Sequence, residues 1–163
     1  IRDRAMSTQL YDVLDVVGRR FQEVFSQLFG GGTAQIVLTD PDNILTGGID
    51  FYIQPPGKKR QQLTLLSGGE RALTVIALLF SFLDYRPAPF CVLDEVDAAL
   101  DEANVERFSS YLNRVNKETQ FIVVSHRKKT MEAAEVLQGV TMVERGVSRL
   151  LTVAFEDVKE DLA

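Results

Sequence analysis

Three short segments of the chain carry side chains that could act on a phosphate group. Ser67-Gly68-Gly69-Glu70 stands directly before an apolar stretch that predicts a helix. Asp94-Glu95 follows the apolar run Phe90 to Leu93, and Ser125-His126 follows the apolar run Phe121 to Val124. Each segment places hydroxyl, carboxylate or imidazole groups at the end of a regular element, where ligands commonly bind in α/β proteins.

The Ser-Gly-Gly-Glu segment has a local interpretation and a functional one. Ser67 can cap the following helix, and Glu70, three residues later, completes a capping box. Gly68 and Gly69 lower the helix propensity at this position, but they leave backbone N–H groups open to close approach. A helix N-terminus with open N–H groups and a hydroxyl is suited to binding a phosphate.

The other two segments suggest chemistry at strand ends. Apolar residues followed by Asp94-Glu95 are typical of a Walker B motif, in which the Asp helps to hold Mg²⁺ and the Glu acts on the attacking water. A carboxylate pair that caps the next helix is the alternative. His126 is the only histidine of the chain. A lone histidine is usually structural, but an imidazole at this strand end could contact a phosphate oxygen.

The N-terminal part of the chain predicts one helix and two strands. Apolar residues from Leu10 to Leu28 recur at alternating spacings of four and three, which fits a coiled-coil segment or an amphipathic helix lying on a core. Gly30-Gly31-Gly32 ends this helix. A phosphate-binding loop is the weaker interpretation of these glycines, because no Lys-Ser or Lys-Thr follows. Strands are predicted for Ala34 to Leu38 and Ile49 to Ile53, with turn residues between them.

The rest of the chain alternates strands and helices, which indicates an α/β fold with mainly parallel central strands and antiparallel strands at the edges. The apolar runs before Asp94 and Ser125 predict strands buried on both faces. Two short strands are expected to close the chain around a turn at Gly146. Predicted helices cover Leu73 to Leu83, Asp101 to Val115 and Lys128 to Leu137, and the closing strands lie near Val140 to Glu144 and Arg149 to Phe155.

Composition bounds the class of protein. The chain has 163 residues, which suits one domain or one lobe of a domain, and it begins with Ile1, as a piece or processed product of a longer polypeptide would. One Cys and one His exclude an internal disulfide and a structural zinc site. A net charge of -5 argues against a dedicated nucleic-acid-binding domain. No apolar run is long enough to span a bilayer.

The ordered series of segments resembles the C-terminal head lobe of prokaryotic SMC (structural maintenance of chromosomes) proteins, which are ABC-type ATPases. Leu66 to Glu70 looks like the signature motif, Val92 to Glu95 like Walker B, and Ser125-His126 like the switch histidine. The likeness extends from about Phe21 to Phe155 and includes the string Gln54-Pro55-Pro56-Gly57-Lys58-Lys59. The D-loop of this pattern corresponds to Ala98, Ala99, Leu100 and Asp101.

The resemblance implies how the chain divides into parts and that its Walker A loop lies in another segment of the protein. Residues 1–29 would be the helix where a coiled coil enters the head, and residues 30–163 would be the C-terminal lobe. No G-x-x-x-x-G-K-[ST] motif, and so no Walker A loop, occurs in the chain. In the SMC family that loop lies in an N-terminal lobe. We therefore expect this chain to be half of an ATPase head and inactive in ATP hydrolysis without that lobe and a second head.

The resemblance also implies site residues. Asp94 would assist Mg²⁺ binding through water, and Glu95 and His126 would be catalytic at the ATP of their own head. The D-loop would lie across the interface between two heads. The signature residues expected to contact the ATP of the second head are Ser67, Gly68, Gly69 and Glu70.

The implied cofactors are ATP and Mg²⁺. The implied partners are the N-terminal head lobe, a second head in an ATP-dependent homodimer, a kleisin subunit near Arg149 to Phe155, and DNA through the complete complex, with no membrane. The expected function is that of a condensin. It drives chromosome condensation, segregation and DNA organisation, in the cytoplasm and associated with the nucleoid.

Three other classes fit part of the pattern. A DNA-repair ATPase with an ABC-type head shares the signature and the Val96-Asp97 pair, but the string from Arg127 to Met131 favours an SMC protein. A non-catalytic interaction module would keep the fold, yet the intact Glu95 argues against lost chemistry. Transporter ATPases usually carry Pro-Thr where this chain has Val96-Asp97, which disfavours them.

Overall fold

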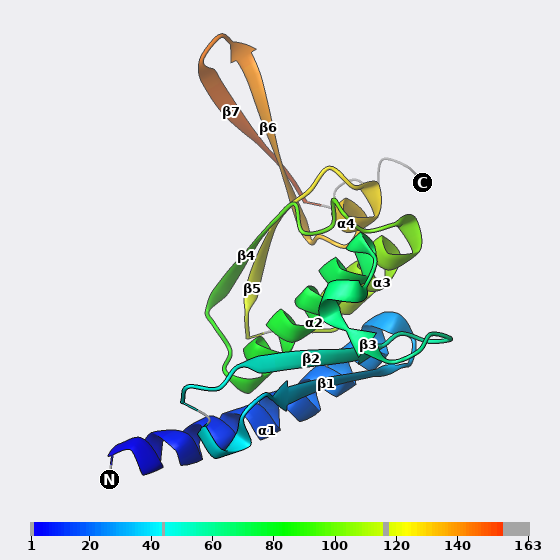
Figure 1. Cartoon of the computed structure of the whole chain (residues 1–163). Helices are drawn as coiled ribbons and strands as arrows, with labels where there is room; N and C mark the ends of the chain where they lie inside the picture. The colour runs from blue at the N-terminus through cyan, green and yellow to red at the C-terminus, as the bar shows by residue number, and fades with distance from the viewer. Residues whose placement is uncertain (1, 44, 116–117, 155–163) are drawn as a thin grey trace.

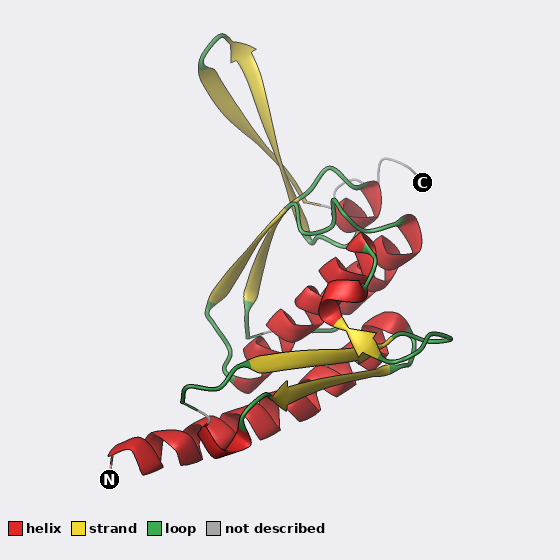
Figure 2. Cartoon of the chain, in the orientation of Figure 1, coloured by secondary structure: helices red, strands yellow, loops and turns green. Residues whose placement is uncertain are grey.

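The computed structural model describes residues 2–43, 45–115 and 118–154 (Figures 1 and 2). The α-helices are α1 (Arg2–Phe29), α2 (Gly68–Tyr85), α3 (Glu102–Leu112) and α4 (Lys128–Glu132). The strands are β1 (Thr33–Leu38), β2 (Ile49–Gln54), β3 (Gln61–Gln62), β4 (Phe90–Asp94), β5 (Gln120–Val124), β6 (Val136–Glu144) and β7 (Val147–Ala154). Short 3-10 turns cover Pro41–Asn43 and Leu63–Leu65.

The strands form three small sheets, which confirms the α/β class. Strands β1, β2 and β3 are antiparallel and lie against α1. Strands β4 and β5 are parallel, with Asp94 beside Val124 at their common end. Strands β6 and β7 form an antiparallel hairpin that projects away from the helices (Figure 1). Parallel pairing in the described residues is therefore confined to β4 and β5.

Helix α1 follows the predicted apolar stripe but begins earlier. Val17, Phe21 and Leu28 are fully buried, as the spacing predicts. The helix begins at Arg2, before the apolar stripe starts at Leu10. Its first turns project beyond the sheet (Figure 1), so they need no apolar face, and Met6 is largely exposed.

The predicted glycine end of α1 is confirmed in detail. Gly30 has φ +71°, the left-handed conformation that glycine adopts most easily. The N–H of Gly31 donates to the carbonyl of Ser26 at 2.8 Å, the bond that closes a Schellman-type helix end.

The core lies where α1, α2 and α3 meet the sheets. Helix α2 packs along α1, and Phe80 of α2 contacts Phe108 and Tyr111 of α3 and Phe121 of β5. These aromatic contacts hold the start of β5 against α2 and α3, and so help to position the strand whose far end leads to Ser125 and His126.

The expectation that β4 and β5 are buried on both faces is wrong for the described chain. Alternate side chains of the two strands face the core, and Leu93 is 2% exposed. Phe90 and Val92 on the opposite face are 58% and 54% exposed, and Ile122 and Val124 lie exposed beside them. The described elements cover one face of this sheet and leave the other face, apolar as it is, open to solvent.

The C-terminal part also departs from prediction. Helix α4 ends at Glu132 rather than Leu137, because the residues from Val136 onward pair as a strand with β7. The hairpin is longer than predicted and turns at Gly146, with φ +82°. Phe155, at the end of the second predicted strand, and the rest of residues 155–163 lie outside the described residues. No described helix combines the length and the apolar character needed to cross a membrane.

Candidate functional site

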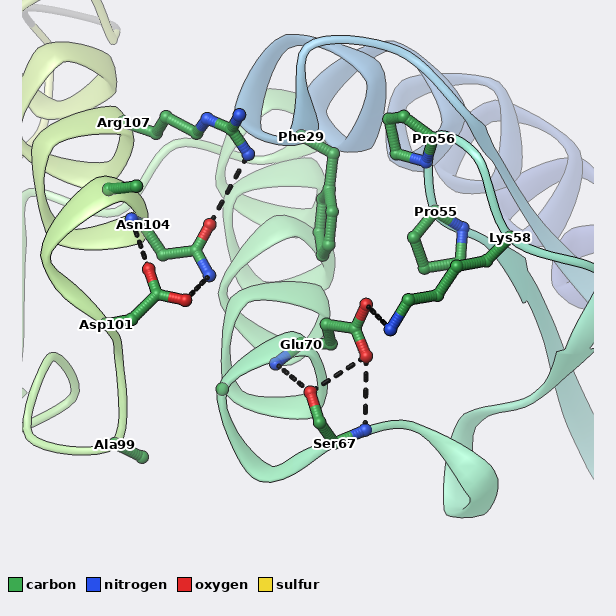
Figure 3. A pocket seen from close by; sticks show the side chains of 12 residues that line it. Phe29, Pro55, Pro56, Lys58, Ser67, Glu70, Ala99, Asp101, Asn104 and Arg107 are labelled. Atoms are coloured by element: carbon green, nitrogen blue, oxygen red, sulfur yellow. Dashed lines mark hydrogen bonds and ion pairs between the residues drawn. The ribbon is translucent and has the colours of Figure 1, made fainter.

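The signature segment (Ser67–Glu70) forms the first turn of α2 and carries the predicted capping box. Ser67 accepts a hydrogen bond from the backbone N–H of Glu70, whose Oε2 accepts from the Ser67 N–H at 3.2 Å. The Ser67 hydroxyl also donates to Oε2 of Glu70 at 2.8 Å. Lys58 Nζ lies 2.9 Å from Oε1 of Glu70 (Figure 3). Lys58 is thus tied to the signature segment.

These contacts set the charge of Glu70. Burial alone would raise the pKa of Glu70, but the hydrogen bonds from Lys58 and Ser67 and the positive charge of Lys58 outweigh it and lower that pKa. Glu70 is therefore ionised at neutral pH and compensates the charge of Lys58. It also holds the Ser67 hydroxyl and Lys58 together at the N-terminus of α2, where anions are stabilised.

The signature segment meets the D-loop (Ala98–Asp101). A Cβ placed on Gly69 would lie 3.2 Å from the carbonyl oxygen of Ala99, so glycine allows the two segments to approach closely. Asp101 caps α3 by accepting from the N–H of Asn104 at 2.8 Å. The two segments share an open groove of about 510 Å³ (Figure 3). Ser67, Gly69, Glu70, Ala99, Asp101 and Lys58 are among its lining residues.

The Walker B pair and the switch histidine meet at a different place. Because β4 and β5 are parallel and in register, Asp94 lies beside Val124, and the Glu95 N–H donates to the carbonyl of Val124 at 2.9 Å. Ser125 and His126 follow directly after Val124. Asp94, Glu95 and His126 all have exposed side chains at this common strand end.

Glu95 has an unusual backbone conformation. Its φ of +49° is the only positive value at a non-glycine residue in the described part of the chain. Such a conformation costs about 1–3 kcal/mol and persists only where the surrounding structure holds it, and residues of this kind cluster at functional sites. It turns the chain sharply after β4 and leads it into the D-loop.

The predicted site residues thus divide between two surfaces. Ser67, Gly69, Glu70, Ala99 and Asp101 line the groove, whereas Asp94, Glu95 and His126 do not. Gly68 is exposed at the start of α2, Ala98 is exposed, and Leu100 is buried. Each surface carries groups suited to phosphate.

The side chains of this chain would supply only part of the ligand shell of a metal ion, and phosphate oxygens and waters would complete it. The described residues contain no cluster of three His, Cys, Asp or Glu side chains that could hold an ion. Mg²⁺ in phosphoryl-transfer sites usually takes one or two carboxylates, with substrate phosphates and waters completing its shell. The exposed Asp94 carboxylate fits that partial role.

Sequence reasoning missed the contacts that Asp97 and Arg127 make next to the site. Asp97 is fully buried, and its Oδ2 accepts hydrogen bonds from the hydroxyls of Ser125 and Thr130. Arg127 donates to the carbonyl oxygens of Ala98 and Leu100, each at 3.2 Å. The sequence holds no signal for these contacts, because Asp and Arg are usually exposed.

Comparison with known proteins identifies the family. The family model described as RecF/RecN/SMC N terminal domain matches residues 15–149. The chain is 58% identical over 158 residues to the Chromosome partition protein Smc of Bacillus subtilis, covering 97% of this chain and 13% of that protein. This chain thus spans about one eighth of that relative's length.

Solved structures agree in fold. The Smc head domain of Pyrococcus furiosus, with an extended coiled coil and bound to the C-terminal domain of ScpA, superposes with a TM-score of 0.88 at 34% identity, over 98% of this chain and 40% of that one. A chain from work on ATP-driven dimerization and DNA-stimulated activation of SMC ATPases superposes with a TM-score of 0.84 at 35% identity, over 96% of this chain and 94% of that one. The chain therefore belongs to the SMC family, and its fold matches that of SMC head domains.

Proposed function

We propose that this chain is the signature and Walker B half of an SMC ATPase head, and that two completed heads bind and hydrolyse ATP between them to drive chromosome condensation and segregation. The observation that carries the proposal is the division of the phosphate-suited groups between two surfaces of one lobe. Asp94, Glu95 and His126 do not line the groove that holds the signature segment and the D-loop. Two heads facing each other can use one surface from each.

The chain needs a second lobe to hold a nucleotide of its own. It lacks a Walker A motif, and it spans only a small part of its relatives. The open face of β4 and β5 supports this need, because Phe90, Val92, Ile122 and Val124 form a contiguous apolar strip that water contacts in the lobe alone. We infer that the N-terminal lobe covers this face and supplies Walker A, and that the lobe alone is inactive.

At the ATP of its own head, the strand-end surface does the chemistry. Glu95 is exposed next to Asp94, and its carboxylate would accept a proton from the attacking water. His126, one strand away, can donate to an oxygen of the γ-phosphate. Asp94 would hold Mg²⁺, directly or through water, and the bound metal would neutralise phosphate charge during transfer.

At the ATP of the second head, the groove surface provides the contacts. The N-terminal turn of α2 presents backbone N–H groups at Gly68 and Gly69, and the Ser67 hydroxyl lies beside them. Ser67 currently donates to Glu70, so contact with a phosphate requires this hydroxyl to rotate. The D-loop lies against the same groove, which fits a role at the interface between heads.

The wider assembly follows from the family. ScpA is bound to the Smc head domain of Pyrococcus furiosus, which supports a kleisin partner for this chain. We expect contact on the projecting β6–β7 hairpin, whose residues Val140, Met142 and Leu150 are exposed. Action on DNA belongs to the complete complex, and we expect it in the cytoplasm, at the nucleoid.

The central test is Glu95→Gln in the full-length protein. This change removes the proton acceptor but keeps the size of the side chain. We expect ATP hydrolysis to fall at least a hundredfold, while ATP-dependent pairing of heads persists or increases, because binding contacts remain. Steady-state phosphate release and analytical ultracentrifugation measure the two effects. Normal turnover in this variant would contradict the role of Glu95.

Ser67→Arg tests the assignment to the second head. The long cation fills the groove next to Gly69, so pairing should be lost while ATP binding to a single head stays within about twofold of wild type. Thr64→Arg is a matched control, since Thr64 is also exposed but does not line the groove. If Ser67→Arg abolishes single-head ATP binding in a folded protein, the assignment to the second head is wrong.

A further inference from the structure

Arg127 and Asp97 connect the two surfaces of the lobe. Asp97 lies between the Walker B pair and the D-loop, and its carboxylate reaches across to Ser125 at the end of β5 and to Thr130 in α4. Arg127, which directly follows His126, donates hydrogen bonds from its guanidinium group to two carbonyl oxygens of the D-loop. Ser125 joins the two systems, since its hydroxyl donates to Asp97 at 2.6 Å and accepts from the Arg127 N–H at 2.9 Å.

This network is built from groups that are costly to bury. Asp97 is fully buried, and within the described residues its Oδ1 and the Nε of Arg127 are buried without a hydrogen-bond partner. An apolar residue at position 97 would avoid the cost of a buried carboxylate. A buried polar group that is only partly satisfied calls for a reason beyond stability.

The geometry of the network supplies such a reason. Backbone hydrogen bonds from Ala98 to Glu95 and from Leu100 to Asp97 fold residues 95–100 into successive turns. Two bonds from one guanidinium group then hold the Ala98 and Leu100 carbonyls, and charged donors make the stronger hydrogen bonds. The D-loop thus cannot move far without moving the chain that carries His126.

We propose that Arg127 and Asp97 are positioning residues that hold the D-loop and the His126 segment as one unit, so that contact with the γ-phosphate in one head sets the surface offered to the other head. This proposal rests on the proposed function. Neither residue touches the nucleotide. Loss of the network should uncouple ATP binding from head pairing and hydrolysis.

The test is Arg127→Met in the full-length protein, with Lys128→Met as the matched control. Met keeps the apolar stem of Arg127 and removes the guanidinium group. Lys128 is the next residue, its side chain is 89% exposed, and its ion pair with Glu132 is long at 3.8 Å. For Arg127→Met we expect kcat to fall about tenfold or more, with the KM for ATP and single-head ATP binding within about twofold of wild type.

A second readout separates positioning from mere stability. In the Glu95→Gln background, which traps paired heads, Arg127→Met should weaken ATP-dependent pairing about tenfold while the melting temperature stays close to that of the parent. Arg127→Lys, which keeps a charged donor near the carbonyls, should recover part of the pairing. Lys128→Met should behave as the parent in every assay.

Several results would overturn the proposal. Unchanged kcat and unchanged head pairing in Arg127→Met would do so. An equal loss of kcat and pairing in Lys128→Met would do so too, as would a joint fall of melting temperature, ATP binding and kcat in Arg127→Met. If Arg127→Met does not fold, Thr130→Val decides, because it removes one contact to Asp97 at nearly constant volume. We then expect about a threefold loss of kcat, and an unchanged kcat would refute the network. Failure of the proposed function is distinct, since full-length Glu95→Gln would then still hydrolyse ATP.

Discussion

Gly68→Ala should stabilise the fold and weaken function at the same time. Gly68 is the first residue of α2, and a Cβ built there meets nothing within 4 Å. Ala in a helix is more stable than Gly by about 0.5–1 kcal/mol, and the lower value suits a first turn. For a chain of this size, a gain of about 0.5 kcal/mol raises Tm by about 1–2 °C.

The same methyl group should obstruct the partner's nucleotide. If a phosphate of the second head's ATP lies against the N–H groups of Gly68 and Gly69, a Cβ at position 68 stands in its approach. Loss of one hydrogen bond to a charged group costs about 1.5–3 kcal/mol, which corresponds to pairing about 10- to 150-fold weaker. Differential scanning fluorimetry gives Tm, and analytical ultracentrifugation in the Glu95→Gln background gives the pairing affinity.

Gly146→Ala is the matched control with the opposite expectation. Gly146 lies in the distant β6–β7 turn with φ +82° and has equally open surroundings. Ala there should destabilise by about 1–2 kcal/mol, because L-residues disfavour that conformation, and pairing should be unaffected. Pairing within twofold of the parent in Gly68→Ala would refute the view that this glycine serves phosphate approach.

Two further predictions concern the fold that holds the site. Glu70→Gln keeps the capping geometry but removes the charge that Lys58 and Ser67 stabilise. Because the pKa of Glu70 is lowered in the folded chain, wild type should be more stable than this variant above about pH 5, and this difference should disappear as the pH falls through the folded pKa of Glu70. Urea unfolding midpoints at several pH values measure the difference in stability. A difference that grows on acidification would contradict the prediction. Gly32→Ala should destabilise by more than about 3 kcal/mol, because Gly32 has φ +85° and its Cβ would lie 2.4 Å from the carbonyl oxygen of Gln54. Gly30→Ala, with φ +71° and open space, should cost only about 1–2 kcal/mol in the same urea titration, and equal costs would show that the close approach is unimportant.

Local signals in the sequence predicted the elements well where one segment determines its own structure. The capping box of Ser67 and Glu70, the glycine end of α1 and the turn at Gly146 were all predictable, because each depends on residues within one turn. The strand ends carrying Asp94 and Ser125 were also predictable, since a short apolar run followed by polar residues marks the end of a strand.

Features that depend on distant partners were not predictable in this way. The apolar run Phe90 to Leu93 predicts burial on both faces, but Val92 is exposed in this chain, and we infer that a second lobe covers it. Helix α4 is shorter than its pattern because pairing with β7 outweighs local propensity from Val136 onward. The Lys58–Glu70 ion pair and the buried Asp97 join residues that lie 12 or more positions apart, and no spacing rule connects them.

The measurement that tests the central claim most directly is ATP hydrolysis by this chain alone and after addition of the N-terminal lobe of the same protein. The account predicts no turnover by the chain alone, turnover in the mixture, and loss of that turnover with Glu95→Gln. Hydrolysis by the chain alone, or a folded, ATP-binding mixture whose turnover is indifferent to Glu95→Gln, would contradict it.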